Sequence, residues 1–141
     1  ELAIKVSQKF NHLPSYLMAL NYASIVSYIC NETTFAKVTI ERARQEFKSD
    51  SHLYLVFLPT DELNAWLNQD TDLLKNICEQ IEQTGQVHSL SFYKTMYIDT
   101  LIESKQIDRA STQLSELTSW CETQNEKIML NKLKELKNGI C

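Results

Sequence analysis

The stretch that decides the fold is YIDTLIESKQIDRASTQLSEL, residues 97–117. Its apolar residues follow one face of a helix up to Ile102, are absent from a polar turn, and resume at Ile107 with the same helical spacing. This pattern is typical of two antiparallel helices joined by a short turn. The stretch therefore predicts a helical hairpin, and the rest of the chain decides whether that hairpin is repeated.

The composition favours a protein made only of helices. The chain of 141 residues contains two Gly and two Pro, where average usage would give about 10 and about 7. Strand hairpins depend on Gly, Asn and Asp turns, so this scarcity argues against a sheet. The apolar run LYLVFL at 53–58 has no second strand candidate to pair with. We therefore expect it to be helical, with a kink at Pro59.

Apolar stripes repeat along the chain. Equivalent stripes begin at Ala36, Leu74 and Ala110, which are 38 and 36 residues apart, and each continues four and seven residues later. A period in the mid-thirties is typical of a helical solenoid, in which each hairpin buries its apolar face against the next. We therefore expect an all-α fold of about seven helices, in antiparallel hairpins stacked as an α-solenoid. The expected elements of this single domain over 1–141 are hairpins at 14–48, 51–84 and 88–122 and a C-terminal helix at 124–138.

The two ends of the chain carry further signals. Residues 2–10 resemble the helix of a preceding hairpin, so we expect the chain to be a fragment of a longer protein. At the other end, Thr123 and Glu126 have the spacing of a capping box, which would start the last helix. Gly139 stands where a left-handed residue would end it.

Residues 97–117 resemble the second half of a tetratricopeptide repeat. Ala110 falls on that family's alanine, Leu114 on its aromatic position and Leu101 on its tyrosine. The resemblance covers about 15–122 in outline and 94–122 in motif, and it implies a TPR-like α-solenoid.

The chain departs from the family's pattern at three positions: Lys94 where the family has Trp, Ile98 where it has Gly, and Glu122 where it has Pro. The first two hairpins match only in period and stripe. A plain helical bundle with hairpins of similar length is the alternative.

The resemblance also implies a binding surface. In that family the first helix of each hairpin faces a concave surface that binds peptides or partner helices. The matching positions, which we expect to contact a partner, are Asn21, Tyr28, Trp66, Phe92, Thr95 and Asp99. The alternative for Tyr28 and Trp66 is that they fill the core, as apolar helical stripes usually do.

Charge and motifs exclude several function classes. The net charge of −4 lacks the basic face that nucleic-acid binding requires, and no run of 18 apolar residues predicts a membrane span. The cysteines and histidines lack metal-ligand spacing, and no catalytic motif or phosphate-binding loop is present. We therefore expect no metal, cofactor or enzymatic activity.

These exclusions favour a cytoplasmic protein- or peptide-interaction or sensory module of a larger regulatory or signalling protein, such as a transcription regulator. The alternative is a helical small-molecule-binding or enzymatic domain with a pocket between its helices.

Overall fold

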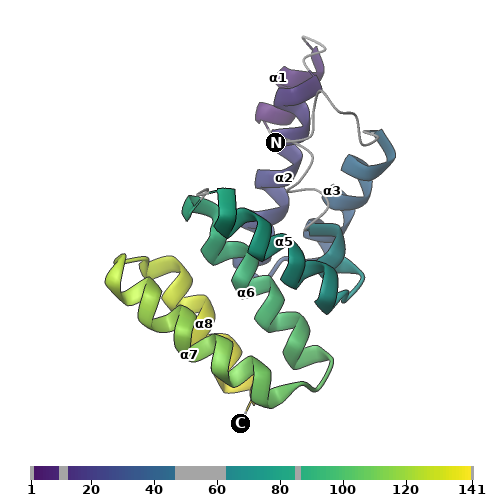
Figure 1. Ribbon diagram of the computed structural model, residues 1–141. Coiled ribbons are helices and arrows are strands. Elements are labelled where there is room, and N and C mark those ends of the chain that lie inside the picture. The colour runs from purple at the N-terminus through teal and green to yellow at the C-terminus, as the bar shows by residue number, and fades with distance from the viewer. Residues whose placement is uncertain (1, 10–12, 47–62, 85–86, 141) are drawn as a thin grey trace. The chain divides into compact units, whose positions relative to one another are not determined.

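The computed structural model describes residues 2–9, 13–46, 63–84 and 87–140, and within them every regular element is an α-helix (Figure 1). The helices are α1 (Leu2–Lys9), α2 (Leu13–Ile29), α3 (Thr33–Glu46), α5 (Thr71–Thr84), α6 (Val87–Glu103), α7 (Ile107–Thr123) and α8 (Lys127–Ile140). Residues 63–67 are helical as well. The prediction of an all-α fold is thus confirmed for this part of the chain, whereas the run at 53–58 and Pro59 lie outside it.

The chain divides into two compact units, Glu1–Leu67 and Asn68–Cys141. In the first unit α2 packs against both α1 and α3. A cluster of buried apolar side chains joins these three helices: Ile4, Tyr16, Leu17, Leu20 and Ala43. A buried polar contact adds to it, since the hydroxyls of Ser24 and Thr39 lie 2.6 Å apart across α2 and α3.

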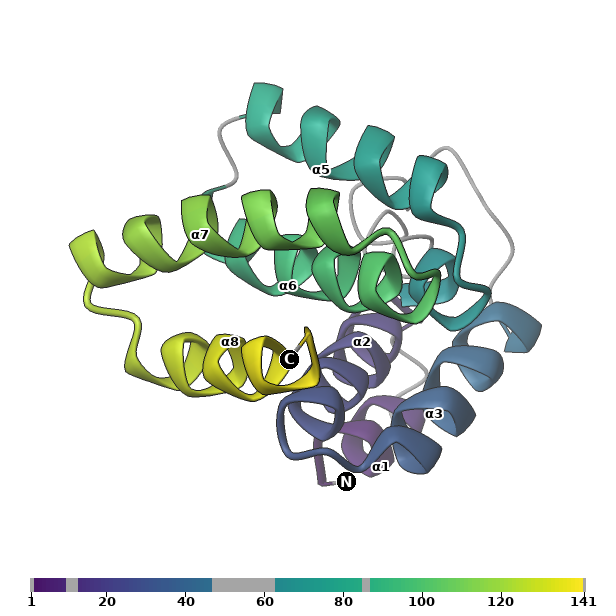
Figure 2. The same cartoon turned by 90° about the horizontal axis from the view of Figure 1, so that it is seen from below.

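In the second unit α6 packs against α5, α7 and α8, and α7 also packs against α8 (Figure 2). The largest fully buried side chains of α6 are Met96, Ile98 and Leu101. A helix with three helical neighbours must be apolar on most of its circumference. The sequence of α6 meets this condition, and α6 forms the centre of this unit.

The three predicted stripes lie in the core. Ala36, Leu74 and Ala110 are fully buried, and the residues four and seven positions after each of them are at most 5% exposed. These stripes belong to α3, α5 and α7, the second helices of the predicted hairpins. Helical periodicity therefore located the buried faces correctly.

Three connections between helices in the described part of the chain share one backbone geometry, at Asn31, Lys105 and Asn125. Among the described residues, those with positive φ other than glycine are Asn31, Gln69, Lys105 and Asn125, and the first three are again 38 and 36 residues apart. At Lys105 the N–H of the following Gln106 donates to the carbonyl of Leu101 at 2.8 Å, and the N–H of Lys105 donates to Ile102 at 2.9 Å. This pair of bonds is a Schellman motif, which ends a helix with one left-handed residue.

The next helix begins at once. The carbonyl of Gln106 accepts the first helical bond of α7, from the N–H of Ala110 at 3.0 Å. The same bonds surround Asn31 and Asn125. One left-handed residue and one cap thus form the whole connection, and this explains how the chain turns with so little glycine.

The predicted boundaries of the last helix are wrong. The Thr123 hydroxyl donates to the carbonyl of Ser119 at 2.9 Å within α7, so it does not cap α8. Because Asn125 adopts the left-handed conformation, Glu126 becomes the residue whose carbonyl starts α8. Gly139 lies inside α8, which continues through Ile140. At its start, Asn125 and Glu126 take the place of the predicted cap.

Candidate functional site

Four of the six predicted contact residues are buried. Asn21, Tyr28 and Thr95 are at most 5% exposed and Trp66 is 8% exposed. The Tyr28 and Trp66 rings meet edge to face with centroids 4.9 Å apart, within the first unit. The Thr95 hydroxyl donates to the carbonyl of Ser91 at 2.6 Å. The expected exposure of these side chains is therefore wrong, and Tyr28 and Trp66 fill the core.

The remaining two predicted residues, Phe92 and Asp99, are half-buried on α6. They lie in the second unit, whereas Asn21, Tyr28 and Trp66 lie in the first. A role for Phe92 and Asp99 in partner binding stays a prediction. Replacing Asn21 by Ala would remove a buried side chain.

A hollow lies between α7 and α8. It encloses about 590 Å³. Its floor is apolar, since Leu114 and Leu133 are at most 5% exposed and Leu130 and Ile140 are half-buried. We call this hollow the α7/α8 groove, and its lining residues are Ser111, Leu114, Ser115, Thr118, Ser119, Glu122, Leu130, Leu133, Lys134, Lys137 and Ile140.

The walls of the α7/α8 groove follow from the periodicity of its two helices. Ser111, Ser115 and Ser119 recur every four residues, so they form one row of small exposed side chains on α7. Lys134 and Lys137 form the corresponding exposed row on α8. Small side chains let another backbone approach closely, and the lysines give one wall a positive charge.

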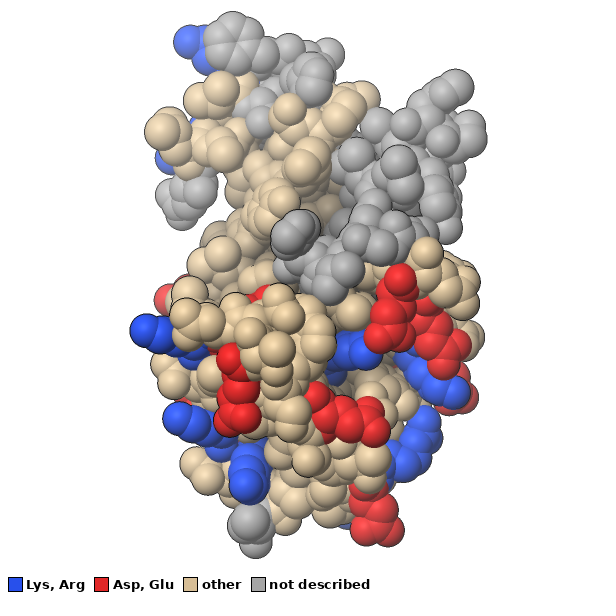
Figure 3. Space-filling view, turned by 60° about the vertical axis from the view of Figure 1, so that its left-hand side comes forward, with Lys and Arg blue, Asp and Glu red and all other residues tan. Residues whose placement is uncertain are grey.

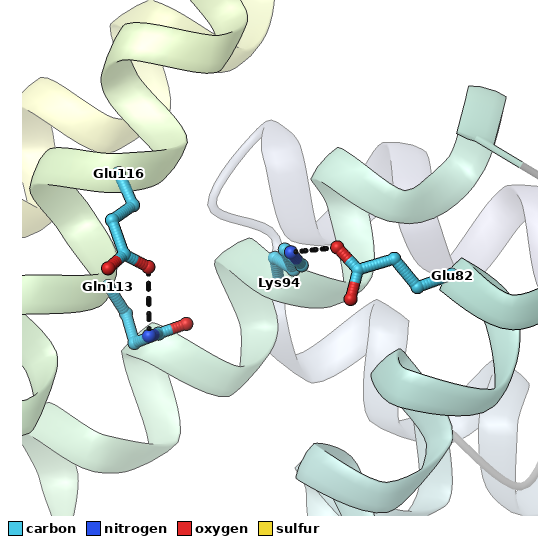
Figure 4. Close-up of polar contacts among 4 residues, drawn as sticks. All are labelled: Glu82, Lys94, Gln113 and Glu116. Carbon is cyan, nitrogen blue, oxygen red and sulfur yellow. Dashed lines mark hydrogen bonds and ion pairs between the residues drawn. The ribbon is translucent and has the colours of Figure 1, made fainter.

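A second, polar cleft lies among α5, α6 and α7. Lys94 of α6 turns toward Glu82 of α5, with Nζ 2.7 Å from Oε1, and on α7 the Gln113 amide donates to Glu116 at 3.1 Å (Figure 4). Two cavities of about 220 and 330 Å³ are lined by these residues. The Ser91 hydroxyl borders the smaller one, and it is buried without a hydrogen-bond partner in the described part of the chain.

The two sites are lined by residues at matching positions along their helices. On the side of the second helices, Lys75, Glu79 and Glu82 of α5 line the polar cleft, and Ser111, Ser115 and Thr118 of α7 line the groove, 36 residues later in each case. On the side of the first helices, Leu90, Lys94 and Tyr97 of α6 correspond to Leu130, Lys134 and Lys137 of α8, 40 residues later. In the polar cleft α7 packs on α6, and cavities remain between these helices and α5. The equivalent surface formed by α7 and α8 is the groove.

The buried Cys121 thiol of α7 is a poor nucleophile. Burial raises the pKa of the Cys121 thiol from 9.0 to about 11, and the nearby Glu126 carboxylate adds to this effect. The described residues include no group of three His, Cys, Asp or Glu side chains placed to hold a metal ion. On the face shown in Figure 3, basic and acidic side chains are intermixed.

None of the helices in the described ranges combines the length and apolar character needed to cross a membrane. Comparisons of the chain with protein-family models, curated proteins and solved structures found no match. The likeness to tetratricopeptide repeats therefore stays a prediction that depends on residues 94–122.

The residues of the α7/α8 groove were missed by sequence reasoning. The sequence does contain the signal, since Leu90, Lys94 and Leu130, Lys134 have the same spacing on successive first helices. To use that signal one must know that α7 packs on α6, which carries Leu90 and Lys94. The sequence alone does not reveal that packing.

Proposed function

We propose that this chain is a non-catalytic protein-interaction module, part of a larger regulatory protein, that binds a partner's amphipathic helix in the α7/α8 groove. One observation carries the proposal: the corresponding helix α6, whose Leu90, Lys94 and Tyr97 match Leu130, Lys134 and Lys137 of α8, already holds a helix, α7, against it. A surface that accepts a helix once in a repeat is suited to accept one again. This mode of recognition, a helix laid in a groove, is common among peptide-binding proteins.

The lining of the groove favours such a ligand. Its leucine floor offers apolar surface whose burial contributes roughly 25 cal/mol per Å². The serine row keeps the open groove wettable and still allows close approach of a second helix. Rim charges from Lys134, Lys137 and Glu122 contribute to the choice of partner more than to the affinity itself.

The test is to fill the groove. Ser115→Trp places a large ring in it, whereas Thr112→Trp adds the same ring to an exposed position of α7 outside the groove. The probe is a panel of fluorescein-labelled amphipathic helical peptides of 17 residues, the length of α7. We expect peptides that bind the wild type to lose at least tenfold in affinity with Ser115→Trp and little with Thr112→Trp.

Equal losses with both variants would contradict binding in the groove, and so would the absence of binding by every peptide. Circular dichroism at 222 nm shows whether both variants keep their helix content, so a folding defect is recognised separately.

A small ligand in the polar cleft is the second candidate function. The observation in its favour is the buried Ser91 hydroxyl, since an unsatisfied polar group of this kind costs about 1–3 kcal/mol unless something binds it. Lys94 lines this cavity and already pairs with Glu82, so the Glu116 carboxylate and the Trp120 ring are the bordering groups that suit an ammonium group. Ser91→Ala separates an empty cleft from a ligand site. If the cleft binds nothing, the variant should unfold at a higher temperature than the wild type. If the cleft binds small amines, these should raise the unfolding temperature of the wild type but not that of the variant.

A further inference from the structure

We infer the direction and charge pattern of the helix that the α7/α8 groove accepts. It runs antiparallel to α8, carries acidic side chains in its first half against Lys134 and Lys137, and carries basic side chains near its end against Glu122. The inference rests on the proposed function, since it specifies the ligand of the same groove. The occupant is a helix of a partner protein with this charge pattern.

The direction follows from α7, which lies on the equivalent surface. Early in α7, the Arg109 guanidinium donates to the Tyr97 hydroxyl near the end of α6 at 2.9 Å. Late in α7, Trp120 borders the same cavity as Leu90 near the start of α6. The two helices are therefore antiparallel. Since Lys137 and Leu130 correspond to Tyr97 and Leu90, the beginning of a helix in the groove lies at Lys137 and its later part at Leu130.

The charge pattern follows from a pairing that the groove lacks. In the polar cleft Lys94 pairs with Glu82 of the preceding second helix. In the groove Lys134 replaces Lys94, but the residue equivalent to Glu82 is Thr118, which has no charge. Neither Lys134 nor Lys137 forms an ion pair with a residue that the structure describes. A carboxylate from the occupant would supply the missing partner, and α7 likewise contributes a carboxylate, Glu116, to the lining of the cavity that Lys94 borders.

Helix physics favours the same arrangement. Acidic residues are stabilising in the first turn of a helix and basic residues in its last turn, because of the helix dipole. The occupant's first turn lies at Lys137 and its last turns lie toward Glu122, at the end of α7. A helix with acidic residues in its first turn and basic residues in its last turn is therefore stabilised by its own dipole, and it also places opposite charges against Lys137 and Glu122. The reversed helix would place like charges together at both ends.

The experiment compares two labelled 17-residue peptides with identical composition and apolar stripe. The acid-first peptide has Glu in its first half and Lys in its last turn, and the base-first peptide has the reverse. Fluorescence polarisation with the full chain should show the acid-first peptide binding about fivefold tighter, as expected for two exposed ion pairs. Lys134→Glu with Lys137→Glu should reverse this preference, whereas the matched exposed pair Lys5→Glu with Lys37→Glu should leave it unchanged.

The outcomes separate the two proposals. If both peptides bind equally and Ser115→Trp blocks them, the groove binds helices but the inferred direction and charges are wrong. If neither peptide binds, the proposed function fails as well. If sedimentation shows that the chain dimerises and Ser115→Trp makes it monomeric, the occupant is a second copy, and the inferred partner helix is overturned.

Discussion

Replacing Lys105 by Gly should stabilise the second unit, because Lys105 ends α6 in the left-handed conformation with φ of 60°. That conformation costs a residue with a side chain about 1–2 kcal/mol. Glycine avoids this cost but loses about 0.5–1 kcal/mol more backbone entropy on folding. The difference predicts a gain of about 0.5–1 kcal/mol in the free energy of unfolding for Lys105→Gly.

The other left-handed residues extend this prediction. Gln69 should respond to Gly as Lys105 does, because both carry long side chains at nearly the same φ. Asn31 and Asn125 should gain less, since asparagine tolerates the left-handed region better than most residues. Lys105→Ala should give no gain, because alanine keeps the Cβ atom that causes the strain.

The assay is urea unfolding followed by circular dichroism at 222 nm, with Glu103→Gly as the matched control. Glu103 is exposed in the last turn of α6, so glycine there should destabilise the chain by up to about 1 kcal/mol. The reasoning would be refuted if Lys105→Gly destabilised the chain as Glu103→Gly does. That result would mean that the turn does not require a left-handed residue.

Two further predictions concern the core. Trp66→Ala should lower the free energy of unfolding in urea by about 3–5 kcal/mol, because it removes a buried ring and its contact with Tyr28. Tyr22→Ala, at a side chain of α2 that is 62% exposed, should lower it by at most about 0.5 kcal/mol. Equal effects would show that Trp66 is not in the core. Iodoacetamide at pH 8.5 should label the exposed Cys30 much faster than Cys121, whose thiol has its pKa raised to about 11. Because the unfolded thiol loses its proton near pH 9.0, the stability from Cys121 should be complete below that pH and lost as the pH rises toward about 11, whereas Cys121→Ser should remove this pH dependence.

Periodicity in the sequence was sufficient to predict helices and their buried faces. Ala36, Leu74 and Ala110 were found from spacing alone, because a side chain's place on a helix depends only on its position in the 3.6-residue turn. Boundaries were less predictable. Asn125 is a residue type that tolerates the left-handed position at a helix end, but the capping-box spacing of Thr123 and Glu126 favoured a start three residues earlier.

Polarity was a poor guide to exposure. Thr95 and Ser24 were compatible with a surface, yet both are buried, since each hydroxyl donates to the carbonyl four residues earlier in its own helix. A short polar side chain that satisfies itself in this way can enter a core at little cost. The predicted contact surface on the first helices was wrong mainly for this reason, because it assumed that polar side chains such as Asn21 and Thr95 are exposed.

The sequence by itself determined the helical class, the hairpin period and the buried stripe of each second helix, because these depend on local spacing. Only the tertiary structure decided which surface stays open. The α7/α8 groove requires α7 to pack on α6 and α8 to pack on both. Among the described residues, its Lys134 is recognised as unpaired only by comparison with Lys94, which pairs with Glu82 in the polar cleft. Such pairing depends on contacts between residues distant in the chain, and the spacing within any one helix carries no information about them.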